Sequence, residues 1–115
     1  MSKPSHKDFG CILSIINSID RIKEYSKPFK TADDFFNNTI SFDAALMNFI
    51  VIGEMAEKLS DEFRSETDAE IDWFKIKGFR NIIAHNYFGI DAEEVWQIIH
   101  DSLGELKIAL SEIIN

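Results

Sequence analysis

Apolar residues recur along most of this chain at steps of three and four, the spacing that gives an α-helix one apolar face. The first run ends near Tyr25 and comprises Phe9, Ile12, Leu13, Ile16, Ile19 and Ile22. The second comprises Ala45, Leu46, Phe49, Ile52, Gly53, Ala56 and Leu59, and the last comprises Val95, Ile98, Ile99, Leu103, Leu106, Leu110 and Ile113. No segment sustains the two-residue alternation of a half-buried strand. The pattern predicts an all-α fold, an up-and-down bundle of four main helices plus a short helix.

Polar residues divide the first half of the chain into separate helices. The sequence SKPF ends the first helix, and Thr31 followed by Asp34 is typical of a capping box, here at the start of a short helix in TADDFFNN. Ser41 is predicted to open the longest helix. The acidic segment SDEFRSETDAE that follows this helix is predicted to be a connector with an irregular helical turn.

The last two main helices also begin at good N-caps. Asp72 is expected to cap a helix over about Trp73–Tyr87, with Gly89 as its C-terminal stop. Asp91, with Glu94 three residues later, is expected to cap the final helix. The most polar helical stretch therefore lies at the end of the fourth element.

Length and composition predict one domain, residues 1–115, that buries roughly 60–70% of its unfolded surface. Phe35–Ile52 contains three asparagines and an aspartate, which is too polar for a membrane span. The N-terminus MSKPSHKDFG lacks the apolar segment of a signal peptide. A single cysteine, Cys11, excludes an internal disulfide and fits a reducing compartment. We expect a cytoplasmic protein with no membrane partner.

The formal net charge of −8 argues against a broad nucleic-acid-binding surface, because non-specific affinity depends on neutralising phosphates with Lys and Arg. The charges are unevenly distributed, however. A stretch without any acidic residue contains four basic ones: Lys75, Lys77, Arg80 and His85. Such a local concentration of positive charge in an acidic chain indicates a site for a small anionic group.

On a helix with about 100° per residue, the polar residues of this stretch form two adjoining rows. The rows are Lys77–Arg80–Tyr87 and Asn81–His85, and Ile76, Ile82 and Ile83 are left to pack. His85 would lie in the last turn, where the helix dipole favours an imidazolium. A histidine beside a permanent cation suits acid–base work on a phosphodiester. Taken singly, each of these residues is more typical of a capping, surface or core position.

The run Arg80-Asn81-Ile82-Ile83-Ala84-His85-Asn86-Tyr87 resembles the signature of HepT-like proteins: arginine, four residues, histidine, any residue, tyrosine. These are small HEPN-domain toxins encoded beside a minimal nucleotidyltransferase antitoxin. The resemblance covers nearly the whole chain, including IGEMAEKLS, the lead-in WFKIKGFRN and the exit YFGID. Similar sequences usually carry proline before the tryptophan, where this chain has Asp72. Either residue begins a helix well.

The resemblance implies a toxin of a type II/VII-like toxin–antitoxin pair, a metal-independent endoribonuclease that acts as a homodimer across a shared cleft. RNA would supply its own nucleophile, the 2′-hydroxyl. His85 would withdraw or return the proton and Arg80 would stabilise charge on the phosphoryl oxygens, with Asn81 and Lys77 in support. Two chains would provide both an acid and a base. Tyr87 would be the residue to which the partner nucleotidyltransferase attaches AMP.

Two other functions are open at this point. A non-catalytic HEPN module would bind a nucleotide or a nucleotidyltransferase partner through the same cleft, but would not need a titrating histidine. A plain helical dimerisation protein would explain the apolar faces and leave the basic stretch unexplained. Metal ligation is disfavoured because the chain has neither HExxH nor Glu-x-x-His spacing, so no cofactor is expected. Glu54 is either part of the site or an ordinary helix-pairing glutamate.

Overall fold

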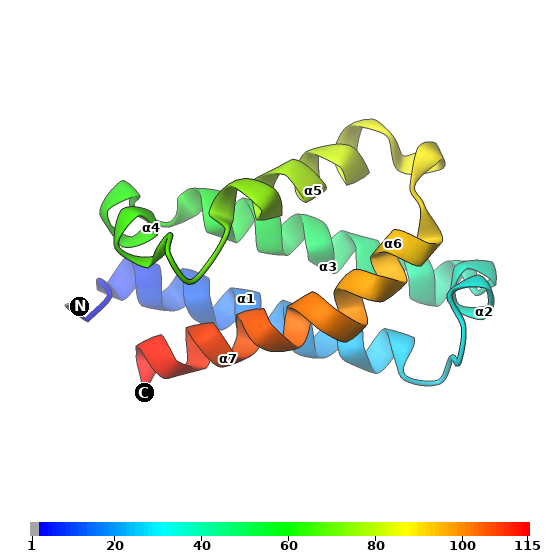
Figure 1. Ribbon diagram of the computed structural model, residues 1–115, viewed down its shortest axis with the longest axis horizontal. Helices are drawn as coiled ribbons and strands as arrows, with labels where there is room; N and C mark the ends of the chain where they lie inside the picture. The colour runs from blue at the N-terminus through cyan, green and yellow to red at the C-terminus, as the bar shows by residue number, and fades with distance from the viewer. Residues whose placement is uncertain (1–2) are drawn as a thin grey trace.

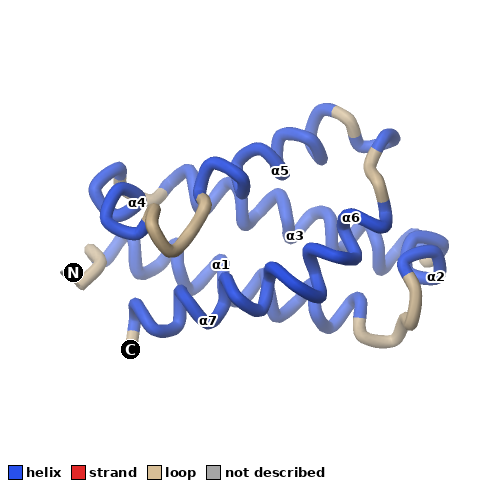
Figure 2. Tube along the Cα trace, in the orientation of Figure 1, coloured by secondary structure: helices blue, strands red, loops and turns tan. Residues whose placement is uncertain are grey.

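The computed structural model describes residues 3–115, and this part of the chain contains helices and loops but no strand (Figure 2). In chain order the elements are α1 (His6–Ser26), α2 (Ala32–Asn37), α3 (Thr39–Lys58), α4 (Asp61–Thr67), α5 (Trp73–His85), the 3₁₀ turn η1 (Tyr87–Gly89), α6 (Ala92–Gln97), the π-helical turn η2 (Ile98–Ser102) and α7 (Leu103–Ile114). The predicted all-α fold is confirmed.

The four main helices are α1, α3, α5 and the continuous helical path α6–η2–α7, and they run alternately up and down (Figure 1). Helix α3 packs between α1 and α5, while α7 packs on α1. The apolar face of α1 shows why: Ile12, Ile15, Ile19 and Ile22 are all completely buried. Burial of such faces is the main stabilising term of a helical bundle.

Helix α4 corrects the prediction of a connector with an irregular turn. Ser60 caps it by accepting a hydrogen bond from the Phe63 amide at 3.1 Å. The buried Thr67 hydroxyl accepts a hydrogen bond from the Trp73 indole at 2.8 Å. Two side chains of this acidic segment, Phe63 and Thr67, are therefore buried. The hydrogen bond to Thr67 holds α4 against the start of α5.

Helix α3 begins at Thr39 with Asn38 as its N-cap, two residues before the predicted start at Ser41. By length and composition alone, Thr39–Lys58 is apolar enough to cross a membrane. Its buried face, which includes Leu46, Phe49 and Ile52, contributes to the hydrophobic core. These contacts are those of a central core helix.

Candidate active site

Helix α5 carries most of the predicted site. Asp72 caps it as expected, accepting from the Lys75 amide at 2.9 Å. The helix ends at His85, two residues before the predicted end, and Tyr87 begins the 3₁₀ turn η1. The prediction that one continuous helix places Tyr87 on the same face as Arg80 is therefore wrong. The chain leaves the helix after His85, and Tyr87 contacts α3 from the 3₁₀ turn η1.

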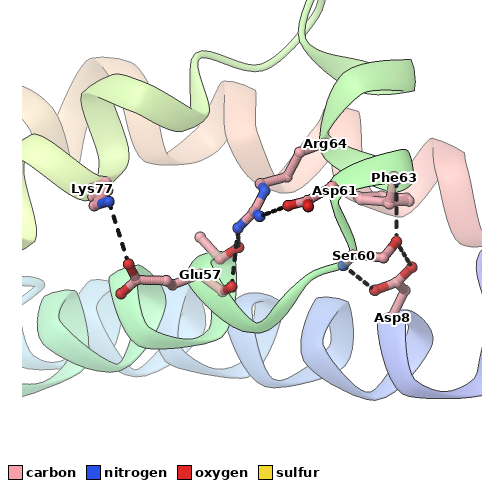
Figure 3. Close-up of polar contacts among 8 residues, drawn as sticks. Asp8, Glu57, Ser60, Asp61, Phe63, Arg64 and Lys77 are labelled. Atoms are coloured by element: carbon pink, nitrogen blue, oxygen red, sulfur yellow. Dashed lines mark hydrogen bonds and ion pairs between the residues drawn. The ribbon is translucent and has the colours of Figure 1, made fainter.

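Three side chains of the site contact acidic residues of α3. Lys77 Nζ lies 3.4 Å from Glu57 Oε1, as Figure 3 shows, and an Nη2 hydrogen of Arg80 is donated to Glu54. The Tyr87 hydroxyl donates to Asp43. Because the three acids are spaced by eleven and then three residues, they share one face of α3. This face lies alongside the antiparallel α5, so the site is built between two helices.

The acids of α3 change the electrostatics expected from the sequence. The basic stretch of α5 has no acidic residue of its own, yet Glu54 and Glu57 each form an ion pair with one of its cations. Asp43 and Glu57 were not identified from the sequence, and Glu54 was left undecided. Their spacing along one helix face is a signal in the sequence, but it becomes meaningful only once α3 is known to pack on α5.

Arg80 is more enclosed than Lys77, the other paired cation of the site: 27% of its side chain is exposed, against 57% for Lys77. Besides Glu54, its guanidinium donates from Nη1 to Asn81 Oδ1 at 3.1 Å. The stem crosses α3 at Gly53, which is buried. Arg80 is thus held by one neighbour on its own helix and by two residues of α3.

His85 is different, because it is the last residue of α5 and is exposed. Within residues 3–115, its ring makes no hydrogen bond, and Asn81 engages Arg80 instead of the imidazole. The two residues of the predicted row Asn81–His85 are therefore not joined by a hydrogen bond. The ring is free to meet a group from outside the chain, as an acid–base residue requires.

Tyr87 is 40% exposed, and its ring packs edge-to-face against Phe88 with centroids 5.1 Å apart. The hydrogen bond to Asp43, aided by partial burial and the nearby negative charge, raises the pKa of the Tyr87 phenol above its usual 10.0. The hydroxyl is neutral at physiological pH, and any reaction at its oxygen requires a base. Asp43 already accepts its hydrogen.

The outward face of α5 is more apolar than expected. Ile82, predicted to pack inside with Ile76 and Ile83, is 48% exposed. Phe74 is 86% exposed and Phe88 is 99% exposed. A groove of about 670 Å³ between α5 and η2–α7 is lined by apolar residues that include Phe79 and Leu106, but Arg80, His85 and Tyr87 do not line it. The candidate catalytic residues lie outside this groove.

Potential metal ligands are scattered in the part of the chain that the structure describes, residues 3–115. No group of three or more His, Cys, Asp or Glu side chains is placed to hold a metal ion there. The acidic face of α3 is engaged with Lys77, Arg80 and Tyr87. Its carboxylates therefore act as partners of the α5 residues.

The helical bundle and this α3–α5 site together define an all-α, HEPN-like protein. The family model described as "Ribonuclease HepT-like" matches residues 15–113, and the chain belongs to this family. The resemblance seen in the motif of α5 is thereby confirmed. No solved structure matches the chain.

Three relatives show the extent of the similarity. "Putative RNase MJ1380" of Methanocaldococcus jannaschii is 31% identical, over 93% of this chain and 94% of that protein. "Probable ribonuclease HepT" of Thermococcus cleftensis is 27% identical, over 91% of this chain and 92% of that protein. "Gamma-glutamylcyclotransferase and putative RNase MJ0434" of Methanocaldococcus jannaschii is 34% identical over 88% of this chain, which spans only 45% of that longer protein.

Proposed function

We propose that this chain is a metal-independent endoribonuclease, the toxin of a toxin–antitoxin pair, which cleaves RNA at a site shared by two copies of the chain. Membership of the HepT-like family supports the reaction class. The observation that carries the assignment is that α5 presents both an exposed His85, whose ring makes no hydrogen bond within residues 3–115, and an Arg80 that is held in place five residues earlier.

The proposed reaction uses the 2′-hydroxyl of RNA as the nucleophile. Its oxygen forms a bond to the adjacent phosphorus while the bond from phosphorus to the 5′-oxygen breaks. A base takes the 2′-hydroxyl proton and an acid gives one to the departing 5′-oxygen, which yields a 2′,3′-cyclic phosphate and a 5′-hydroxyl end. His85 performs the proton transfers, and Arg80 stabilises the negative charge on the phosphoryl oxygens.

A homodimer is part of the proposal because each chain offers one histidine at the site, whereas the reaction uses both an acid and a base. The exposed Phe74 of α5 and Phe88 of η1 support it, since large exposed apolar side chains commonly mark an interface. Phe88 directly follows Tyr87 of the motif in the chain. Association through the end of α5 and η1 would bring two copies of His85 toward one another.

The proposed regulation is AMP transfer to Tyr87 by a partner nucleotidyltransferase in the same cytoplasm. The Tyr87 oxygen would bond to the α-phosphorus of ATP, pyrophosphate would leave, and Asp43 would take the phenolic proton. The resulting phosphodiester adds bulk and negative charge beside a site that must bind an anionic backbone. Such a group would block RNA by both sterics and charge repulsion.

One observation favours a second function, that of a non-catalytic module that binds a nucleotide or a nucleotidyltransferase. Lys77 and Arg80 are each already paired with a carboxylate of α3. A site neutralised in this way has less positive charge with which to attract a long RNA. A binding module would bind a nucleotide or a nucleotidyltransferase and would not cut RNA.

The deciding experiment is incubation of the purified protein with total RNA in EDTA. We expect cleavage, and a loss of about 10²–10⁴-fold in rate for both His85→Ala and Arg80→Ala. His100→Ala and Arg21→Ala are matched controls, because each removes an exposed residue of the same type from another helical segment. Both should cut at the wild-type rate. Wild-type cleavage by a folded His85→Ala variant would refute the assignment.

A further inference from the structure

We propose that Gly53 and Glu54 of α3 form a seat that fixes Arg80 for the reaction, with Glu54 as a positioning residue. The inference rests on the proposed function, because it assigns Arg80 a transition-state role that requires a fixed orientation. Gly53 accommodates the stem of the arginine, and the neighbouring Glu54 holds its head. Two consecutive residues of one helix thereby determine where a residue of another helix points.

The contact at Gly53 is too close for any other residue. A Cβ atom added there would lie 2.4 Å from Arg80 Cβ and 2.5 Å from Arg80 Cγ. Those two atoms are at the base of the side chain, so a change of rotamer at the tip cannot relieve the clash. Any side chain at position 53 must push α5 away from α3. Glycine is therefore required for the depth at which Arg80 is seated.

The hydrogen bonds of the Arg80 guanidinium fix its orientation. Nη2 donates to Glu54 and Nη1 donates to Asn81, while Nε is buried and has no partner within residues 3–115. Leaving a buried donor unpaired destabilises a protein. The hydrogen bonds from Nη1 and Nη2 keep the Arg80 side chain in this position although Nε is unpaired. A cation held in advance loses little freedom when it meets a developing charge.

The ion pair between Lys77 and Glu57 also joins α5 to α3 and can be compared with the pair between Arg80 and Glu54. Its two side chains are 57% and 50% exposed, whereas those of Arg80 and Glu54 are 27% and 39% exposed. Its nitrogen–oxygen distance of 3.4 Å is that of a loose surface ion pair, a kind that contributes little. Glu57→Ala is thus a comparison for the structural readout, because it removes a glutamate of the same helix without disturbing Arg80. The matched control for activity is Glu24→Ala, which removes an exposed glutamate of α1, outside the site.

The test is steady-state cleavage of a short RNA. Glu54→Ala should lower kcat by about tenfold or more with KM nearly unchanged, because a misplaced group affects the transition state most. Glu54→Gln should fall between it and the wild type, since its amide oxygen still accepts a hydrogen bond. Glu24→Ala should match the wild type. Equal kcat values for folded Glu54→Ala and the wild type would overturn the proposal.

Chemical rescue separates positioning from a merely structural role. Guanidinium ions added to Arg80→Ala should restore part of the activity, because Glu54 and the space above Gly53 still form a seat for them. The double variant Arg80→Ala/Glu54→Ala should show no such rescue, and Arg80→Ala/Glu24→Ala should show it in full. Equal rescue in both double variants would contradict the role of Glu54.

A measurement without RNA tests the positioning role of Glu54 separately from the proposed ribonuclease function. The buried Nε–H of Arg80 should give a slowly exchanging ¹⁵N–¹H NMR signal, assigned by its loss in Arg80→Lys. We expect Glu54→Ala to shift this signal and accelerate its exchange with water, and Glu57→Ala to leave it unchanged. An unchanged signal in Glu54→Ala overturns the seat. A wild type that cuts no RNA, with the signal responding as expected, overturns the ribonuclease function alone.

Discussion

At the scale of a single residue, the proposed role of Tyr87 depends on one hydrogen bond, from its hydroxyl to Asp43. A tyrosine that only packed would not need its hydroxyl, and Phe would replace it without consequence. Here the hydroxyl donates to Asp43, and the ring is 40% exposed at the end of the turn that follows His85. An accessible oxygen beside a carboxylate base has the surroundings that nucleotidyl transfer requires.

We predict that Tyr87→Phe keeps most of the RNA cleavage but escapes silencing by the partner nucleotidyltransferase and ATP. The ring and its packing on Phe88 remain, whereas the acceptor of AMP is lost. Intact-mass spectrometry after co-expression measures the result directly. Tyr25→Phe, which removes the hydroxyl of the other tyrosine, should still gain one AMP group. AMP found on Tyr87→Phe, or none found on the wild type, would exclude Tyr87 as the acceptor.

At the scale of elements, a buried carboxylate joins the start of α1 to the start of α4. Asp8 is 3% exposed and accepts from the Ser60 amide at 2.8 Å and from the Ser60 hydroxyl at 2.6 Å (Figure 3). Ser60 in turn caps α4 by accepting from the Phe63 amide. Burial alone would raise the pKa of Asp8, but the hydrogen bonds from Ser60 and Ser5, with the charge of Lys7, bring it below 3.8.

Because the folded-state pKa of Asp8 is lowered, the ionised form stabilises the fold above pH 3.8, and this contribution is lost as the pH falls through the folded-state value. We predict that Asp8→Asn lowers the free energy of unfolding at pH 7 by about 1–3 kcal/mol, as expected for hydrogen bonds to a buried charge. The difference between variant and wild type should shrink as the solution is acidified below pH 4.

Urea unfolding followed by circular dichroism at several pH values measures this effect. Asp33→Asn is the control, because Asp33 is an exposed aspartate in the first turn of α2. Its unfolding free energy should follow that of the wild type at every pH. A constant difference between Asp8→Asn and the wild type from pH 7 to pH 3 would show that the charge of Asp8 is not responsible.

At the scale of the whole molecule, the exposed apolar side chains of α5 and η1 predict an isologous dimer. Light scattering at micromolar concentration should give about twice the chain mass of 13.2 kDa. Phe74→Glu should shift the protein toward monomer and lower the cleavage rate, because it places charge in the proposed interface. Ile108→Glu, at a site 61% exposed on α7, should remain dimeric. A strict monomer that still cleaves RNA would exclude a composite site.

What the sequence determined by itself is the helical architecture and the family. Apolar spacing and capping residues are local signals, so the four main helices and the caps at Thr31, Asp72 and Asp91 follow from them and are found as expected. The motif of α5 identified the family for the same reason, since it lies within one continuous run. Local signals failed where the chain leaves the helix: α5 ends at His85, and Tyr87 begins the 3₁₀ turn η1 instead of continuing the helix.

Only the tertiary structure decided which residues of α3 belong to the site. Asp43, Glu54 and Glu57 lie 44, 26 and 20 positions from their partners in the sequence, and their spacing along one helix face does not show which helix they contact. The close approach at Gly53 brings α3 and α5 together and turns three ordinary carboxylates into partners of Tyr87, Arg80 and Lys77. The distance between two packed helices depends on the volume of the side chains at their contact. That volume depends on both helices, so neither segment alone determines which residues meet.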